Sequence, residues 1–449
     1  SGGAVINDDA AIAPADNAFD RRYEVDLQGA NRILTFDTYD VGADVLVDYI
    51  TTVVPAGQLT AVNNITGGDP SDIYGLVRSA SNIDVWLINP DGITFGSGGG
   101  FSGASLLVST LPFTGTDANL LIELADPTPD VTFSRTDNDL DTDGLGRVFV
   151  QGGATLNSTT GNMVLIGERL TVSGALAADD GSVVMVGARE TTFSDIGSPL
   201  SFSIVEGVRI MEGEAGIRVS GDIEGNSIVA AVGSRDGGSG PLSLMETVLS
   251  IESNATLTAT AVGGTVVLAT ATAATSTTNT ATIANDLTVN ASIGIAGPGD
   301  GIPGDPTETR TLVSDQGGIT ILSNHDVTLA EAEVEASGAV NIGAANDLIA
   351  SDTTILTPGD VALTATAGVL DFATDSTSIG SVINRAGTVT VTAAGATTLG
   401  DVTAALIETV PASGILSGSD LTLGTIDTTT ALDLDASGDV TFAGLVSGG

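Results

Sequence analysis

The chain has 449 residues, and its 13 basic residues, all arginine, stand against 56 acidic ones, which gives a net charge of −43. This balance disfavours binding to nucleic acid or anionic membranes, because few positive charges can neutralise phosphates. Cysteine is absent, so disulfides and thiolate metal sites are excluded. A hydrophobic share of 42% argues against a disordered acidic tail, and no apolar run is long enough to predict a membrane span.

A turn between two apolar strands stands out in the first hundred residues. Residues 85–88 and 93–95 are rich in β-formers, and Asn89-Pro90-Asp91-Gly92 lies between them. Asparagine, proline, aspartate and glycine in this order are the residues that a type I turn prefers. The segment therefore predicts a tight turn that joins two strands.

The turn and its surroundings resemble a known family. Ile93 opens a strand, small residues follow at 96–103, a Ser-Thr-bearing strand follows at 105–111, and Asn64-Ile65-Thr66-Gly67 lies upstream. In this order the segments resemble the haemagglutination activity domain of filamentous-haemagglutinin-like exoproteins, which is also called the two-partner secretion domain. Asp91 replaces the family's usual second asparagine, Phe36 stands where tryptophan is common, and the family's Asn-Pro-Asn-Leu motif is missing.

The resemblance has consequences for fold, export and site. It implies a right-handed parallel β-helix with an N-terminal cap, exported across a Gram-negative outer membrane by a partner transporter. It implies that the secretion motif comprises Asn64, Asn89, Pro90, Asp91, Gly92 and Ile93. Members of the family act as adhesins, haemolysins or surface fibres, so the chain is expected to be secreted and to be extracellular or on the cell surface.

An acidic loop follows. Asp137, Asp139, Asp141 and Asp143 alternate with other residues, and a glycine ends the run. Carboxylates on a flexible loop suit a hard cation such as Ca²⁺, which takes several oxygen ligands. From Asp139 the spacing follows the start of an EF-hand loop, but its twelfth position is Val150 instead of glutamate. Calcium binding is one interpretation, and a solvated loop without a cofactor is the other.

Short alternating strands recur along the rest of the chain. They start at positions 161 and 181, at 318, 338, 359 and, after a longer gap, 387, and at 419 and 438. Such a strand has one apolar face, and a unit this short buries that face only by stacking on its neighbours. The alternative is a β-sandwich, in which strands recur roughly every 8–12 residues. The longer period seen here favours an all-β solenoid.

Aromatic residues are unevenly distributed along the chain. Of the aromatic side chains, only Phe372 and Phe442 lie beyond residue 235. We therefore predict that residues 1–235 form the secretion-like domain with its cap and early coils, and that 236–449 continue the repeat. The cap is expected to pack its larger aromatic side chains, and not to offer them as a sugar-binding platform: Tyr23, Tyr39, Tyr49, Tyr74 and Trp86.

Catalytic residue types are scarce. His325 is the single histidine, and Arg310 and Arg385 are the last two basic residues. The sequence therefore predicts no enzyme, but a structural protein of adhesion, aggregation or a surface fibre, whose ligand it does not identify. A polysaccharide-active β-helix enzyme and the N-terminal part of a toxin-delivery exoprotein are the alternatives. The chain stops just after a repeat strand, and because exposed strand edges invite pairing, head-to-tail self-assembly is expected.

Overall fold

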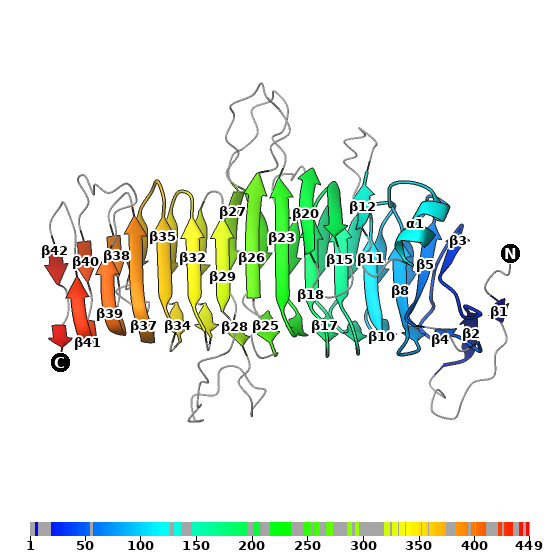
Figure 1. Cartoon of the computed structure of the whole chain (residues 1–449), viewed down its shortest axis with the longest axis horizontal. Helices are drawn as coiled ribbons and strands as arrows, with labels where there is room; N and C mark the ends of the chain where they lie inside the picture. Colours follow the sequence, from blue (N-terminus) through cyan, green and yellow to red (C-terminus); the bar gives the residue numbers. More distant parts are fainter. Residues whose placement is uncertain are drawn as a thin grey trace, which may run out of the picture.

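The protein is an elongated parallel β-helix in the computed structural model (Figure 1). The structure describes the following residues: 5–7, 19–53, 57–125, 130–135, 146–194, 201–206, 208, 216–234, 246–252, 255–260, 266–272, 285–289, 292–295, 318–323, 326–330, 332–336, 338–351, 353–357, 359–373, 382–393, 397–399, 401–409, 421–423, 426–433, 440–442 and 446–448.

Three ladders of parallel strands run along the rod, and a complete coil of the chain gives one strand to each ladder. The first ladder comprises β2 (Arg21–Asp26), β4 (Val45–Ile50), β7 (Leu76–Ser79), β10 (Gly100–Gly103), β14 (Thr155–Ser158), β17 (Ala175–Ala178), β22 (Asp222–Gly225), β25 (Thr256–Ala259), β28 (Ser292–Ile295), β31 (Glu333–Glu335) and β34 (Thr354–Leu356). The second comprises β3 (Arg32–Phe36), β5 (Leu59–Ile65), β8 (Ile83–Ile88), β11 (Ser105–Ser109), β15 (Met163–Gly167), β18 (Val183–Gly187), β23 (Ile228–Ser234), β26 (Val266–Thr272), β29 (Ile319–Ser323), β32 (Val340–Ala344) and β35 (Val361–Ala365).

The third ladder is a separate sheet, whereas the first two merge near the C-terminal end. The third comprises β6 (Ser71–Ile73), β9 (Ile93–Phe95), β13 (Arg147–Val150), β16 (Arg169–Val172), β21 (Ile217–Val219), β24 (Glu246–Ile251), β27 (Asn285–Val289), β30 (Val327–Ala330), β33 (Leu348–Ser351), β36 (Leu370–Ala373), β38 (Thr397–Leu399), β40 (Leu421–Leu423) and β42 (Val440–Phe442). The merged strands are β37 (Val382–Ala393), β39 (Asp401–Thr409) and β41 (Ile426–Asp433), and β43 (Val446–Gly448) pairs with β41. At the opposite end, β1 (Val5–Asn7) runs antiparallel to β2.

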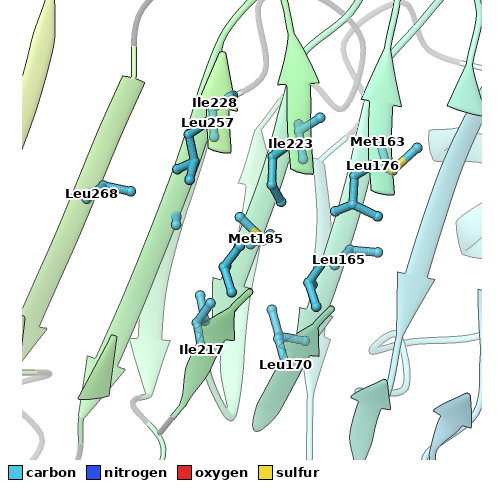
Figure 2. Packing of buried hydrophobic residues seen from close by; sticks show 14 of the residues in the cluster. Met163, Leu165, Leu170, Leu176, Met185, Ile217, Ile223, Ile228, Leu257 and Leu268 are labelled. Atoms are coloured by element: carbon cyan, nitrogen blue, oxygen red, sulfur yellow. The ribbon is translucent and has the colours of Figure 1, made fainter. Parts of the chain in front are cut away.

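The interior of the rod explains the repeat. Alternate side chains of each strand point inward and stack on the equivalent side chains of the next coil. Leu165 pairs with Met185 on the neighbouring strand, and both are fully buried in one apolar core that the described coils share. Figure 2 shows these side chains with Leu170 and Ile217 pointing into the same interior. The predicted all-β solenoid is confirmed, and a β-sandwich is wrong.

The register shows where the predicted period holds and where it breaks. Met163 pairs with Val183, and Val340 pairs with Val361, so these coils have the spacing of the sequence repeat. In contrast, Ile93 pairs with the more distant Val148. The interval holds α1 (Asp117–Glu123) and β12 (Asp130–Ser134), and a later long interval holds β19 (Glu190–Ser194) and β20 (Ser201–Glu206). These two long coils therefore contribute elements outside the rod.

These inserted elements cover one outer face of the rod. Strands β12, β19 and β20 form an antiparallel sheet, which we call the covering sheet. It packs with α1 against outward side chains of the second ladder, and a second buried apolar cluster lies between the two layers. Its members include Trp86 and Leu107 from the rod, Leu120 from α1, and Phe133 and Phe193 from the covering sheet.

The ladders continue past the predicted domain boundary at residue 235. Strand β22 pairs with β25, and β23 pairs with β26, in parallel register. The loop at 235–245 lies outside the described residues. The division into 1–235 and 236–449 stays a prediction.

Close coil stacking leaves no room for side chains at some corners, and Gly75 gives a test. A Cβ added to Gly75 would lie 2.2 Å from the carbonyl oxygens of Gly42 and Val45, whereas one added to the exposed Gly57 would meet nothing within 4 Å. We expect Gly75→Ala to lower the free energy of unfolding by about 1–3 kcal/mol through overpacking. Gly57→Ala should change it by less than about 0.5 kcal/mol. Urea unfolding of both variants checks this, and equal stabilities would contradict the packing.

Candidate functional site

The predicted turn joins β8 to β9 at the corner between the second and third ladders. The amide of Gly92 donates to the carbonyl of Asn89 at 3.1 Å, and the amide of Asp91 donates to the Asn89 side-chain oxygen at 3.0 Å. Gly92 has a φ of +125°, a conformation that favours glycine. Pro90 and Asp91 are half-buried, while Ile93 is buried in the core. The segment therefore offers a small, defined surface on an anchored base.

Asn89 anchors the turn to the coils on both sides. Its side chain is fully buried, and its Nδ2 donates to the Asp69 carbonyl at 2.9 Å and to the Ser71 hydroxyl at 3.0 Å. Its backbone amide donates to the Ser109 carbonyl of the following coil at 3.0 Å. These three bonds make Asn89 a positioning residue, which holds the half-buried turn residues Pro90 and Asp91 in one orientation.

Directly before the upstream motif lies a residue that sequence reasoning missed. Asn64, the predicted residue, is half-buried on β5, whereas its neighbour Asn63 is fully buried. The Asn63 side chain donates to the Trp86 carbonyl at 2.9 Å and accepts a bond from the Tyr49 hydroxyl at 2.6 Å. The alternation of buried Ala61, Asn63 and Ile65 was the available signal, because it places Asn63 on the inward side.

The Tyr49 hydroxyl links Asn63 to a second tyrosine. The hydroxyls of Tyr39 and Tyr49 lie 2.9 Å apart in the core. Burial raises the pKa of Tyr39 and of Tyr49, so both phenols keep their protons around neutral pH. The chain of bonds satisfies polar groups that would otherwise destabilise the interior.

The aromatic side chains pack largely as predicted. Tyr39, Tyr49 and Trp86 are buried, and Tyr23 is half-buried against the core. Tyr74 differs, since it is 41% exposed. Its ring lies over Gly96, where an added Cβ would approach the ring to 2.1 Å.

A buried carboxylate links three coils of the first ladder near the N-terminal end. Asp48 accepts bonds from Arg22 Nη2 at 2.6 Å and from Arg78 Nη2 at 2.8 Å. The Arg22 guanidinium also lies 3.0 Å from Glu24. Two of the scarce arginines thus hold one aspartate between successive strands.

Asp84, on the same strand as Trp86, gives a pH-dependent test. Burial raises the pKa of Asp84 above its ordinary value of 3.8, although hydrogen bonds with Ser105 and Gln58 oppose this. A carboxyl whose pKa is raised by folding favours the fold below its unfolded pKa, and this contribution is lost as the pH rises through the folded pKa. We therefore expect Asp84→Asn to raise the melting temperature at pH 7, with a gain that shrinks towards pH 4. Calorimetry at both pH values checks this, with exposed Asp180→Asn as control. A gain that does not shrink on acidification would contradict the assignment.

The other predicted positions lie outside what the structure describes. These are the candidate calcium ligands Asp137, Asp139, Asp141 and Asp143, and also His325. Calcium binding therefore stays a prediction. Within the described part of the chain, no group of three or more histidine, aspartate or glutamate side chains is placed to hold a metal ion. The same part contains no helix long and apolar enough to span a membrane.

The chain is a parallel β-helix with a short helix and an antiparallel sheet packed on one outer face, and it has an anchored Asn-Pro-Asp-Gly turn. This combination is that of a β-helical secretion domain. The family model of the TPS secretion domain, where TPS stands for two-partner secretion, matches residues 3–289, and the chain belongs to this family. It is therefore a two-partner secretion exoprotein with a β-helical fold. This class implies an outer-membrane transporter as partner during export.

A solved structure supports the fold. The HMW1 secretion domain from Haemophilus influenzae is similar over 99% of this chain and 98% of that one, with a TM-score of 0.52 and 16% sequence identity. At this identity the likeness concerns the fold alone. No curated protein matches the chain significantly.

Proposed function

We propose that the N-terminal coils present the Asn89–Gly92 turn to the partner transporter, and that the rod serves in adhesion, aggregation or a surface fibre. The observation that carries the proposal is the match of the secretion-domain family to residues 3–289. In the structure, the ladders of those residues continue in parallel register into the later coils, where the first two merge. Export region and rod would then be one continuous body that acts outside the cell.

The turn is suited to recognition by a transporter because different residues anchor it and remain accessible. Asn89 is buried and makes the bonds to neighbouring coils, whereas Pro90 and Asp91 remain partly accessible. A transporter would contact the accessible pair, and Asn89 would act by holding that pair in place. Asp91 contributes its backbone amide to the turn, so asparagine can replace it without loss of that bond.

Substitution of Asn89 tests the role of the turn. Asn89→Ala leaves the Asp69 carbonyl and the Ser71 hydroxyl without their buried donor, at a cost of about 1–3 kcal/mol. We expect the amount of chain in the medium to fall in cells that make the partner transporter. Asn341→Ala makes the same chemical change at an exposed position outside the turn; it is the matched control and should be exported like the wild type. Immunoblots of medium and cells measure both, and export of Asn89→Ala at the wild-type level would refute the role of the turn.

The proposed adhesive role has its own test. Cells that export the chain are expected to aggregate or to bind surfaces more than cells in which its gene is deleted. Purified chain added back to the deletion strain should restore part of the effect. Equal aggregation and surface binding of the two strains would remove adhesion, while leaving the export proposal intact.

A further inference from the structure

The outer face of the second ladder changes character along the rod. In coils β5 to β23 many of its outward side chains are large and apolar, and they pack in one buried cluster with residues of the covering sheet and α1. From β26 to β37 the described outward side chains are small or uncharged. In pairing order they are Val267, Thr320, Asn341, Ala362 and Thr390 in one row, and Ala269, Leu322, Gly343, Thr364 and Thr392 in the next. We call these ten residues the neutral face.

The neutral face stands out in so acidic a chain. Residues 236–449 contain 24 acidic and two basic residues, yet none of the ten described positions on this face is charged. Acidic residues border the face: Asp360 precedes β35 and Asp347 follows β32 at the corners. In the next coil Glu408 of β39 pairs with Thr390, so the neutral face ends at β37. Two copies of a chain with a net charge of −43 repel each other, so a face without carboxylates is where they can approach at the least electrostatic cost.

A groove and an exposed leucine lie side by side on the neutral face. Leu322 is 46% exposed, and its Cδ2 leans over Gly343, where an added Cβ would lie 3.0 Å away. Beside it is a groove of about 300 Å³, whose floor and walls include Gly343, Ala345, Ala362 and Thr366. The same surface therefore has an apolar projection and a hollow lined by small residues. Such a surface can be complementary to a second copy of itself.

We propose that the neutral face is a self-association surface, on which two copies pack their second ladders face to face. The Leu322 side chain of each copy would enter the groove of the other. The face continues a surface that the covering sheet already uses as an interface within the chain, and β29, β32 and β35 lie side by side there (Figure 1). This lateral pairing differs from head-to-tail assembly through the ends of the rod.

The area of the neutral face determines how strongly two copies are expected to associate. Its strands β26, β29, β32, β35 and β37, spaced ~4.8 Å apart and about five residues long, cover roughly 400 Å². Stable complexes bury about 800 Å² per partner, so the association should be weak and depend on concentration. Salt should strengthen it, because the Debye length falls from about 10 Å at 0.1 M to about 3 Å at 1 M and the repulsion is screened.

Sedimentation velocity of the purified full chain tests the proposal. The wild type, Leu322→Asp and Gly343→Leu are compared over a concentration series at 0.1 and 1 M NaCl. Leu322→Asp places a carboxylate on the face, whereas Gly343→Leu fills the groove without changing charge. Ile349→Asp is the matched control, because Ile349 is 40% exposed on β33 of another ladder.

The wild type and Ile349→Asp are expected to show sedimentation coefficients that rise with concentration, more strongly at 1 M NaCl. Both neutral-face variants should need at least about tenfold more protein for the same rise, which corresponds to about 1.4 kcal/mol. A wild type that stays monomeric in both salts would overturn the proposal. So would neutral-face variants that associate like the wild type, or an equal loss in Ile349→Asp, which would indicate non-specific association. Circular dichroism verifies that each variant is folded.

Discussion

Phe133→Ala is expected to lower the free energy of unfolding by about 3–5 kcal/mol, the usual cost of removing a buried phenylalanine side chain. Phe133 is fully buried and lies in the middle of the aromatic cluster between rod and covering sheet. Its ring centroid is 6.1 Å from that of Trp86 and 6.1 Å from that of Phe193. The substitution would open a cavity where the covering sheet meets the second ladder, so that the sheet loses its main attachment.

The chain provides a convenient probe for this experiment. Trp86 is its single tryptophan and belongs to the same cluster. In urea, tryptophan emission of Phe133→Ala should shift at a lower denaturant concentration than in the wild type. The matched control is Ile122→Ala on α1, because Ile122 is 67% exposed and should change stability by less than about 0.5 kcal/mol. An unchanged emission transition in Phe133→Ala would show that the covering sheet is not attached through this cluster.

Asp48→Asn is expected to produce the second large effect. Removing one partner of a buried ion pair costs about 3–5 kcal/mol when the remaining charge stays buried. Here the side chains of Arg22 and Arg78 keep 17% and 31% exposure, so water can solvate part of the uncompensated charge. We therefore expect a loss of about 2–3 kcal/mol, below the fully buried case.

The control for Asp48→Asn makes the same chemical change at an exposed site. Asp180 lies on a turn between β17 and β18 and is exposed. Asp180→Asn should leave stability nearly unchanged, since it removes one charge from an excess of negative ones. Urea unfolding followed by circular dichroism compares the two variants. Equal stabilities would mean that the Arg22–Asp48–Arg78 contact contributes nothing to the N-terminal coils.

Much of the rod could be predicted because the patterns that specify it lie within short segments and repeat at a regular spacing. Alternation within strands such as 163–167 and 183–187 determines which side chains point inward, and the offset between these strands in the sequence matches the observed register. The turn at Asn89 was also readable, because each of its four residues has its own positional preference. These features depend on residues that are close together in the sequence or on a regular spacing.

The covering sheet could not be predicted in this way. Strands β12 and β19 pair Asp130 with Ser194, although the two segments are far apart in the sequence and nothing in either one specifies the other. The outward apolar residues of β8 and β11, Trp86 and Leu107, were the available signal, because a strand apolar on both faces needs cover on both. The inward position of Asn63 was not predicted, because its bonding partners Tyr49 and Trp86 lie on other strands.

Membership of the TPS family predicts that this chain is exported by a two-partner route. The most direct measurement compares the medium of cells that contain the partner outer-membrane transporter with the medium of cells that lack it, at equal expression of the chain. The full-length chain is expected in the medium only when the transporter is present, with retained chain found in the cell fraction otherwise. Equal amounts in both media would contradict the claim.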